Sequence, residues 1–85
     1  MKTQIYSVYD TKAEAFGQPF FMQADGIAVR AFAEACKNPE GEFIKYPNDF
    51  TLYQIGMYDD STASIFSNKP VELLTAAQAL SKKDK

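Results

Sequence analysis

The residues with the clearest potential for chemistry are two groups of carboxylates, Asp10 with Asp59 and Asp60, and Glu40 with Glu42. Grouped carboxylates can hold a magnesium ion, or can act as a general acid and a general base. Aspartate at a turn more often accepts hydrogen bonds from the local backbone, and most acidic side chains lie in solvent. We therefore expect these carboxylates to be structural. A small hydrolase built on the acidic turns is the alternative that the sequence supports least.

The cysteine and histidine content narrows the chemistry further, because the 85 residues include one cysteine, Cys36, and no histidine. A single cysteine excludes an intramolecular disulfide and a cysteine metal cluster, and the lack of histidine removes the common zinc sites. A nucleophilic cysteine needs a neighbouring base, for which this chain offers only lysine or carboxylate. We therefore expect Cys36 to be a small buried residue on a helix face, and we expect no metal and no cofactor.

Arg30 is the only arginine, and it lies on the polar side of a predicted helix. Its guanidinium group could clamp a phosphate or a carboxylate. The alternative is an exposed ion pair with Glu34, one helical turn further on, which would contribute a few tenths of a kcal/mol. The spacing favours the ion pair, and the phosphate contact stays open as the alternative.

Aromatic side chains are frequent on the predicted strands, and many single-strand binders stack bases on such side chains. The aromatic residues concerned are Tyr6, Tyr9, Phe20, Phe21, Tyr53 and Tyr58. A stacking surface normally lies in a cationic groove, and the lysines that could frame one are Lys2, Lys12, Lys45 and Lys69. The net charge is −2, but three of the nine basic residues lie beyond residue 81, so residues 1–81 hold six basic and ten acidic side chains. This charge favours a core or a dimer interface over a nucleic-acid platform.

The first half of the chain predicts a hairpin followed by a helix. Residues 2–9 are rich in β-branched and aromatic side chains and run into a turn, and a second strand is expected within residues 14–23, with a bend at Gly17. Asp25 is expected to be the N-cap of a helix over residues 26–37. One face of this helix should pack on the core, formed by Ala28, Ala31, Phe32, Ala35 and Cys36.

The second half predicts another hairpin and a C-terminal helix. Residues 42–49 should connect the long helix to the sheet while lying against the core. Residues 50–58 form the longest predicted strand, and a turn at residues 59–62 leads to a shorter strand over residues 63–67. Behind a proline, residues 71–80 carry apolar side chains at helical spacing and predict a short helix that docks on the sheet or on a partner.

The two predicted hairpins resemble each other. Residues 8–16 (VYDTKAEAF) match residues 57–66 (MYDDSTASIF) with one insertion, and a Tyr-Asp pair precedes each turn. The match indicates that the same turn chemistry is used twice.

Together these elements predict an α+β fold of ββαββ order, in which two hairpins form an antiparallel sheet with one helix packed across it and a short C-terminal helix. The length fits a single domain over residues 1–85, with a core at 1–67, a helical segment at 68–81 and a basic tail at 82–85. The sequence shows neither a secretory signal nor an apolar segment long enough to cross a bilayer, so we expect a cytoplasmic protein. A homodimer would bury aromatic side chains that a small domain otherwise exposes.

Five separated blocks of the sequence occur in the order found in a known family. They are residues 5–15 (IYSVYDTKAEA), 19–21 (PFF), 28–32 (AVRAF) and 47–56 (PNDFTLYQIG), and the Asp59-Asp60 turn. Over residues 2–67 the chain resembles the small non-structural protein of gokushovirus-type microviruses, which are phages with single-stranded DNA genomes. The resemblance implies a virus-encoded protein that is made in the cytoplasm of the infected bacterium and is absent from the virion. It also implies DNA binding, or assistance in the change from duplex replication to single-stranded genome synthesis.

We therefore predict a non-catalytic phage accessory protein that binds single-stranded DNA in viral genome replication, as a homodimer. The alternative is a protein-interaction module that engages a viral or host replication protein without contacting DNA. Neither hypothesis involves a membrane. The predicted nucleic-acid-binding residues are Lys2, Tyr6, Tyr9, Lys12, Arg30, Lys45, Tyr53 and Tyr58.

Overall fold

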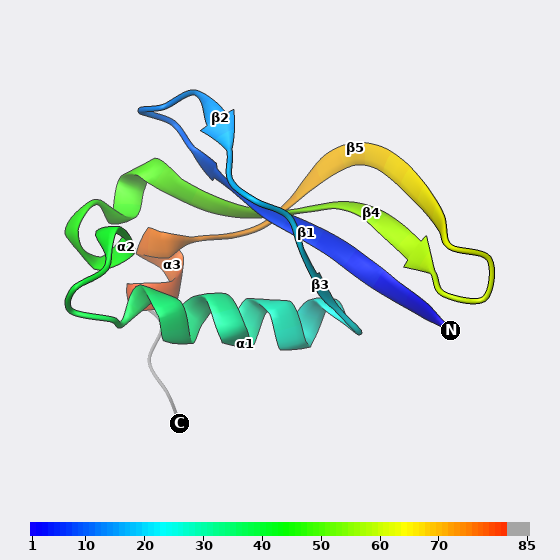
Figure 1. The fold of residues 1–85 in the computed structure, drawn as a ribbon. Coiled ribbons are helices and arrows are strands. Elements are labelled where there is room, and N and C mark those ends of the chain that lie inside the picture. The colour runs from blue at the N-terminus through cyan, green and yellow to red at the C-terminus, as the bar shows by residue number, and fades with distance from the viewer. Residues whose placement is uncertain (82–85) are drawn as a thin grey trace.

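The computed structural model describes residues 1–81 and shows an α+β fold, in which a curled antiparallel sheet lies over one long helix (Figure 1). The strands are β1 (Lys2–Asp10), β2 (Ala15–Phe16), β3 (Phe20–Met22), β4 (Phe50–Asp59) and β5 (Ser64–Thr75). The helices are α1 (Asp25–Cys36), α2 (Glu42–Lys45) and α3 (Ala76–Ser81), with a 3-10 turn η1 (Pro47–Asp49). The predicted fold class is confirmed. Within residues 1–81, no helix has the length and apolar character needed to cross a membrane.

β1 and β4 form the centre of the sheet. The strand order is β2-β1-β4-β5, and all neighbours are antiparallel. β2 pairs with the C-terminal end of β1, and β3 pairs with the same edge of β1 nearer its N-terminal end. The predicted second strand is therefore two short strands separated by residues 17–19. This break follows from Pro19, which has no N–H for the ladder. The last bond to β1 before the break runs from the Gly17 N–H to the Val8 carbonyl, at 2.8 Å.

The core lies between the sheet and α1, with α3 beside α1 (Figure 1). Side chains alternate between the two faces of a strand, so Tyr6 and Leu52 point to this core and are fully buried. Phe43 of α2 packs against the same core, as predicted for the connection between α1 and β4. We call the sheet face that points away from α1 the open face; it carries Tyr9, Phe16, Phe21, Tyr53 and Tyr58.

The start of α1 differs from the prediction. Ala24 is the N-cap and makes no side-chain cap bond, while Asp25 already has helical geometry. The Asp25 carboxylate instead accepts a hydrogen bond of 2.8 Å from the Tyr6 hydroxyl. A buried phenol needs an acceptor, and this need takes the carboxylate away from the capping position.

The core face of α1 is also rotated relative to the prediction. Ala28, Phe32 and Cys36 are buried as predicted. Ala33, expected on the polar side, packs against the core, whereas Ala35 is exposed. The reason is α3, which lies along the Ala33 side of α1 and covers it.

β5 is longer than predicted, and the C-terminal helix is shorter. Residues 71–75, expected to be helical, continue β5, where Leu74 pairs with Leu52 of β4. α3 begins only after Thr75, whose hydroxyl accepts a hydrogen bond of 3.0 Å from the Gln78 N–H. The Gln78 side chain accepts one of 3.0 Å from the Thr75 N–H in return, so a capping box sets the start of the helix. The predicted basic tail at 82–85 lies outside the described residues.

β5 arches away from β4 in its middle (Figure 1). Residues 68–70 of β5 lie opposite Ile55 alone, which is a large bulge. The bulge contains Pro70, and a bulge with a proline blunts an edge strand against pairing with another chain. The flanking pairs are Gln54 with Val71 and Gly56 with Ser67.

The two hairpin turns share one construction, as the sequence match predicted. Asp10 and Asp59 end β1 and β4, and each carboxylate accepts a hydrogen bond of 3.0 Å from the amide two residues further along. The last residue of each loop has a positive φ, 56° at Glu14 and 61° at Ala63. The structural interpretation of Asp10 and Asp59 is confirmed, since both carboxylates order the local backbone.

The left-handed residue of the second turn gives a stability prediction. We expect Ala63→Gly to raise the free energy of unfolding by about 1 kcal/mol, because glycine adopts positive φ without a Cβ clash. Ala13→Gly is the matched control in the first turn: its φ is not positive, so the same change should give no gain. Urea denaturation followed by circular dichroism measures both. Equal gains in the two variants would contradict the role of the backbone angle.

Candidate nucleic-acid interface

Three aromatic rings gather on the open face beside the β1–β2 turn. Tyr9 of β1 lies directly opposite Phe16 of β2, and their ring centroids are 4.8 Å apart. Tyr53 of β4 meets both rings edge-on, at 6.4 Å from Tyr9 and 5.5 Å from Phe16. Phe16 is 44% exposed, so this aromatic cluster is accessible to solvent. We call it the Tyr53 cluster.

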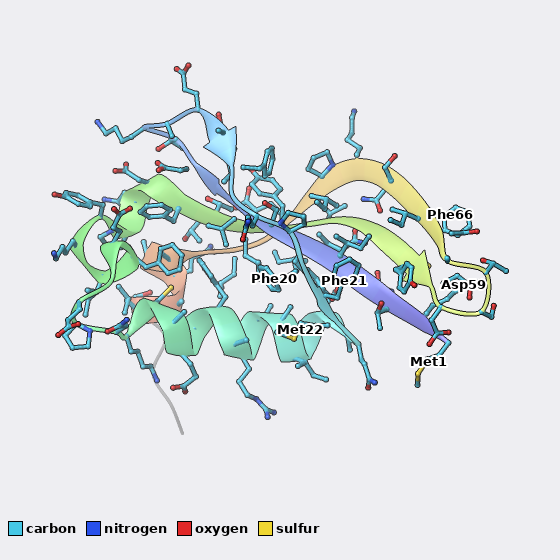
Figure 2. The ribbon with its side chains drawn as sticks, in the orientation of Figure 1. Met1, Phe20, Phe21, Met22, Asp59 and Phe66 are labelled. Carbon is cyan, nitrogen blue, oxygen red and sulfur yellow. The ribbon has the colours of Figure 1, made fainter. Side chains whose placement is uncertain are left out.

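A second aromatic pair lies at the other end of β1. Phe21 and Tyr58 meet edge-on with centroids 5.8 Å apart, and Phe21 is 49% exposed. Phe21 is on the open face because its neighbours in β3, Phe20 and Met22, pack on the core (Figure 2). Both aromatic groups thus stand on one sheet face, toward opposite ends of β1.

Between the two aromatic groups the open face is apolar. A shallow hollow of about 230 Å³ is walled by Phe21 on one side and by Ile65 of β5 on the other. Ile65 and Phe66 are 66% and 52% exposed, which is high for aliphatic and aromatic side chains. The remaining residues around the hollow are Ile5, Pro19, Ile55, Gly56 and Ser67.

The predicted tyrosines divide between the two sides of the sheet. Tyr9, Tyr53 and Tyr58 lie on the open face, as a stacking surface requires. Tyr6 is wrong as a binding residue, because it is fully buried in the core and no base can reach its ring. Burial, together with the hydrogen bond to Asp25, raises the pKa of the Tyr6 hydroxyl.

Two predicted cations lie at the two ends of β1. Lys12 is in the turn that joins Tyr9 to Phe16, and Lys2 starts β1, opposite Asp59. Lys45 is on α2, and Lys69 is in the β5 bulge. Because Thr3 shares the open face with Tyr58, the neighbouring Lys2 points to the opposite face of the sheet. The structure therefore places Lys12 beside the Tyr53 cluster and does not gather the four lysines.

Arg30 lies away from the open face, on α1. It borders a groove between α1 and α3, together with Val29 and Ala33. Glu34, the predicted partner of Arg30, instead forms an ion pair with Lys37, at 3.9 Å. Arg30 is thus not part of a surface shared with the predicted tyrosines.

The residues that the sequence offered as a nucleophile or as metal ligands have structural roles in the fold. Cys36 is fully buried on the core face of α1, as predicted, and burial raises its thiol pKa to about 11. Hydrogen bonds from Ser61 lower the pKa of the Asp59 carboxyl, which orders the turn. In the described part of the chain, no group of three or more carboxylate or cysteine side chains is placed to hold a metal ion.

Phe16 is the site residue that sequence reasoning missed. Residues 13–16 did not distinguish strand from loop, so Phe16 had no assigned face. The signal that could have found it was the match between the two hairpins, in which Phe16 follows the turn that begins at Asp10. A strand after that turn pairs back on β1 and brings Phe16 against Tyr9.

Comparisons with known proteins give the family. Neither the curated proteins nor the solved structures include a match to this chain. A family model described as phage ORF5 protein matches residues 3–79, which is nearly the whole domain and includes the five aromatic residues of the open face. The chain therefore belongs to the phage ORF5 protein family.

Proposed function

We propose that this phage protein is a non-catalytic accessory factor of viral genome replication that binds single-stranded DNA on its open face. The observation that carries the proposal is the Tyr53 cluster, in which three rings share a sheet face that α1 and α3 leave uncovered. Aromatic rings on a sheet surface stack unpaired bases with little dependence on sequence. The second pair, at Phe21 and Tyr58, extends this surface along β1 by about 20 Å at 3.3–3.4 Å per residue, enough for several nucleotides.

The charge of the domain determines whether phosphate contacts or base stacking provides most of the affinity for DNA. Residues 1–81 hold four more acidic than basic side chains, so the domain as a whole repels phosphates. Of the two lysines at the ends of β1, Lys12 lies in the turn beside the Tyr53 cluster, whereas Lys2 points to the other face of the sheet. One phosphate contact gives a slope of about −0.7 for log affinity against log salt, on the single-strand coefficient. Base stacking therefore provides most of the affinity.

The decisive experiment removes one ring of the cluster. We expect Tyr53→Ala to weaken binding of a fluorescent single-stranded oligonucleotide about tenfold, within the range of 1–3 kcal/mol per stacked base. Fluorescence anisotropy at low salt measures the affinity, and Tyr53 is only half-buried, so its loss leaves the core intact.

Tyr46→Ala is the matched control for this experiment. Tyr46 is also an exposed tyrosine, at 58%, but it lies between α2 and η1, off the sheet. Its replacement should leave the affinity within twofold of the parent protein. Absence of oligonucleotide binding at low salt, or an equal loss in Tyr46→Ala, would refute the proposal.

A protein-interaction module is the second candidate, favoured by the exposed apolar side chains of Ile65 and Phe66. Such a patch is typical of protein contacts. In this alternative the partner is a viral or host replication protein, and the oligonucleotide titration is flat. In both cases the protein acts in the cytoplasm of the host bacterium, outside the virion, as a homodimer whose second copy covers apolar side chains of β5.

A further inference from the structure

A second hollow of the open face lies at the free end of the β4–β5 hairpin. It measures about 250 Å³ and is lined by Thr3, Phe21, Tyr58 and Asp60. Sites for drug-sized ligands have about 300–1,000 Å³, so this hollow suits a smaller planar group. Two of its walls are aromatic rings that already meet edge-on at 5.8 Å. We call it the Asp60 hollow.

One residue that lines the Asp60 hollow, Thr3, carries an unsatisfied polar group. The Thr3 hydroxyl oxygen is buried and has no hydrogen-bond partner among residues 1–81. An unpaired buried hydroxyl is unfavourable, and native proteins usually provide it with a partner. Thr3 lies opposite Tyr58 in the β1–β4 register, so its side chain shares a sheet face with the Tyr58 ring.

The rim of the hollow contributes an acceptor. The Asp60 side chain is 57% exposed, and its Oδ1 contacts the Met1 ammonium at 2.7 Å. An ionised carboxylate only accepts hydrogen bonds and has about four lone-pair sites, so one ammonium contact leaves capacity for a ligand. The hollow thus combines aromatic walls with an acceptor-only edge, which fits a flat ring that carries donors.

We infer that the Asp60 hollow binds one base of single-stranded DNA and prefers guanine over thymine, an inference that rests on the DNA binding proposed above. The Watson–Crick edge of guanine carries two adjacent donors, which match the two oxygens of a carboxylate. Thymine has one ring N–H between two carbonyl oxygens, and these repel the Asp60 carboxylate. Open-face binding then has two parts: stacking without base preference at the Tyr53 cluster, and base selection at the Asp60 hollow.

The experiment compares oligothymidine with the same oligonucleotide carrying a single guanine, by competition against a fluorescent strand. We expect the guanine strand to bind the parent protein about tenfold more tightly, the typical discrimination of one bidentate contact to a base. Asp60→Asn should remove most of this advantage while the affinity for oligothymidine changes less than twofold, because the amide presents a donor to the base.

Glu14→Gln is the matched control, since it removes the same charge from the other hairpin turn. This variant should keep the guanine advantage. Equal binding of both strands by the parent protein would overturn the base-selective hollow while leaving DNA binding in place, and loss of the advantage in Glu14→Gln would also overturn it. If the parent protein binds neither strand, the proposed function fails first, and the inference falls with it.

Discussion

Replacing Gly56 by alanine should lower the free energy of unfolding by about 3 kcal/mol, at the upper end for overpacking. A Cβ built on Gly56 would clash with the Phe66 carbonyl oxygen and lie 3.4 Å from the Ser67 Cα. Both obstructing atoms are backbone atoms of β5, so no side-chain rotation can relieve the contact. The β4–β5 pairing must shift, next to the bulge that already interrupts it.

The expected loss is a large share of the total stability. A domain of this size has about 4–13 kcal/mol at the usual figure per residue. Urea denaturation should therefore show a much lower midpoint for Gly56→Ala. The variant should also bind single-stranded DNA less well at temperatures where it is folded, because Gly56 borders the apolar hollow of the open face.

Gly26→Ala is the matched control for this prediction. Gly26 lies in the first turn of α1, and a Cβ built there meets no atom within 4 Å. Alanine is a better helix former than glycine, so this variant should gain about 0.5–1 kcal/mol. A similar loss in both glycine variants, or a neutral Gly56→Ala, would contradict the close approach of β4 and β5.

The central strands and the long helix could be predicted from local patterns, whereas the end of β5 could not. Val71 and Leu74 fit the spacing of a helix and also fit a strand, and residues 71–75 are too short for periodicity to decide. What decides is β4, which offers Leu52 as a partner for Leu74, a contact between distant parts of the chain. The Thr75–Gln78 capping box was present in the sequence, and it marks the true start of the helix.

The residues of the candidate site were also predicted only as far as local patterns allow. Tyr6 and Tyr9 are three residues apart on one strand, so the sequence alone places them on opposite faces. It does not say which face the helix covers, and for that reason both were predicted to bind. The acceptor for the Tyr6 hydroxyl, Asp25, was assigned to the helix cap, since capping is local and the bond to a strand is not.

A buried amide joins the three long strands. Gln54 of β4 is 9% exposed, and its Nε2 donates to Gln4 Oε1 of β1 at 3.0 Å and to the Gly56 carbonyl at 2.7 Å. Its Oε1 accepts a hydrogen bond of 3.1 Å from Asn68 Nδ2 in the β5 bulge. A single side chain thus satisfies polar groups on β1, β4 and β5, where the register shifts leave ladder bonds unmade.

Gln54→Ala should therefore lower the free energy of unfolding by about 3 kcal/mol, because it leaves buried partners unpaired and opens a cavity. Gln54→Leu fills most of the space but keeps the partners unpaired, so it should still lose about 2 kcal/mol. Gln18→Ala removes an exposed glutamine from the bend between β2 and β3 and should change little. Urea denaturation of the three variants separates the polar contribution from the cavity. If Gln54→Leu were as stable as the parent protein, apolar packing alone would hold the β5 bulge in place. The hydrogen bonds of the Gln54 amide would then not be the reason that β5 arches away from β4.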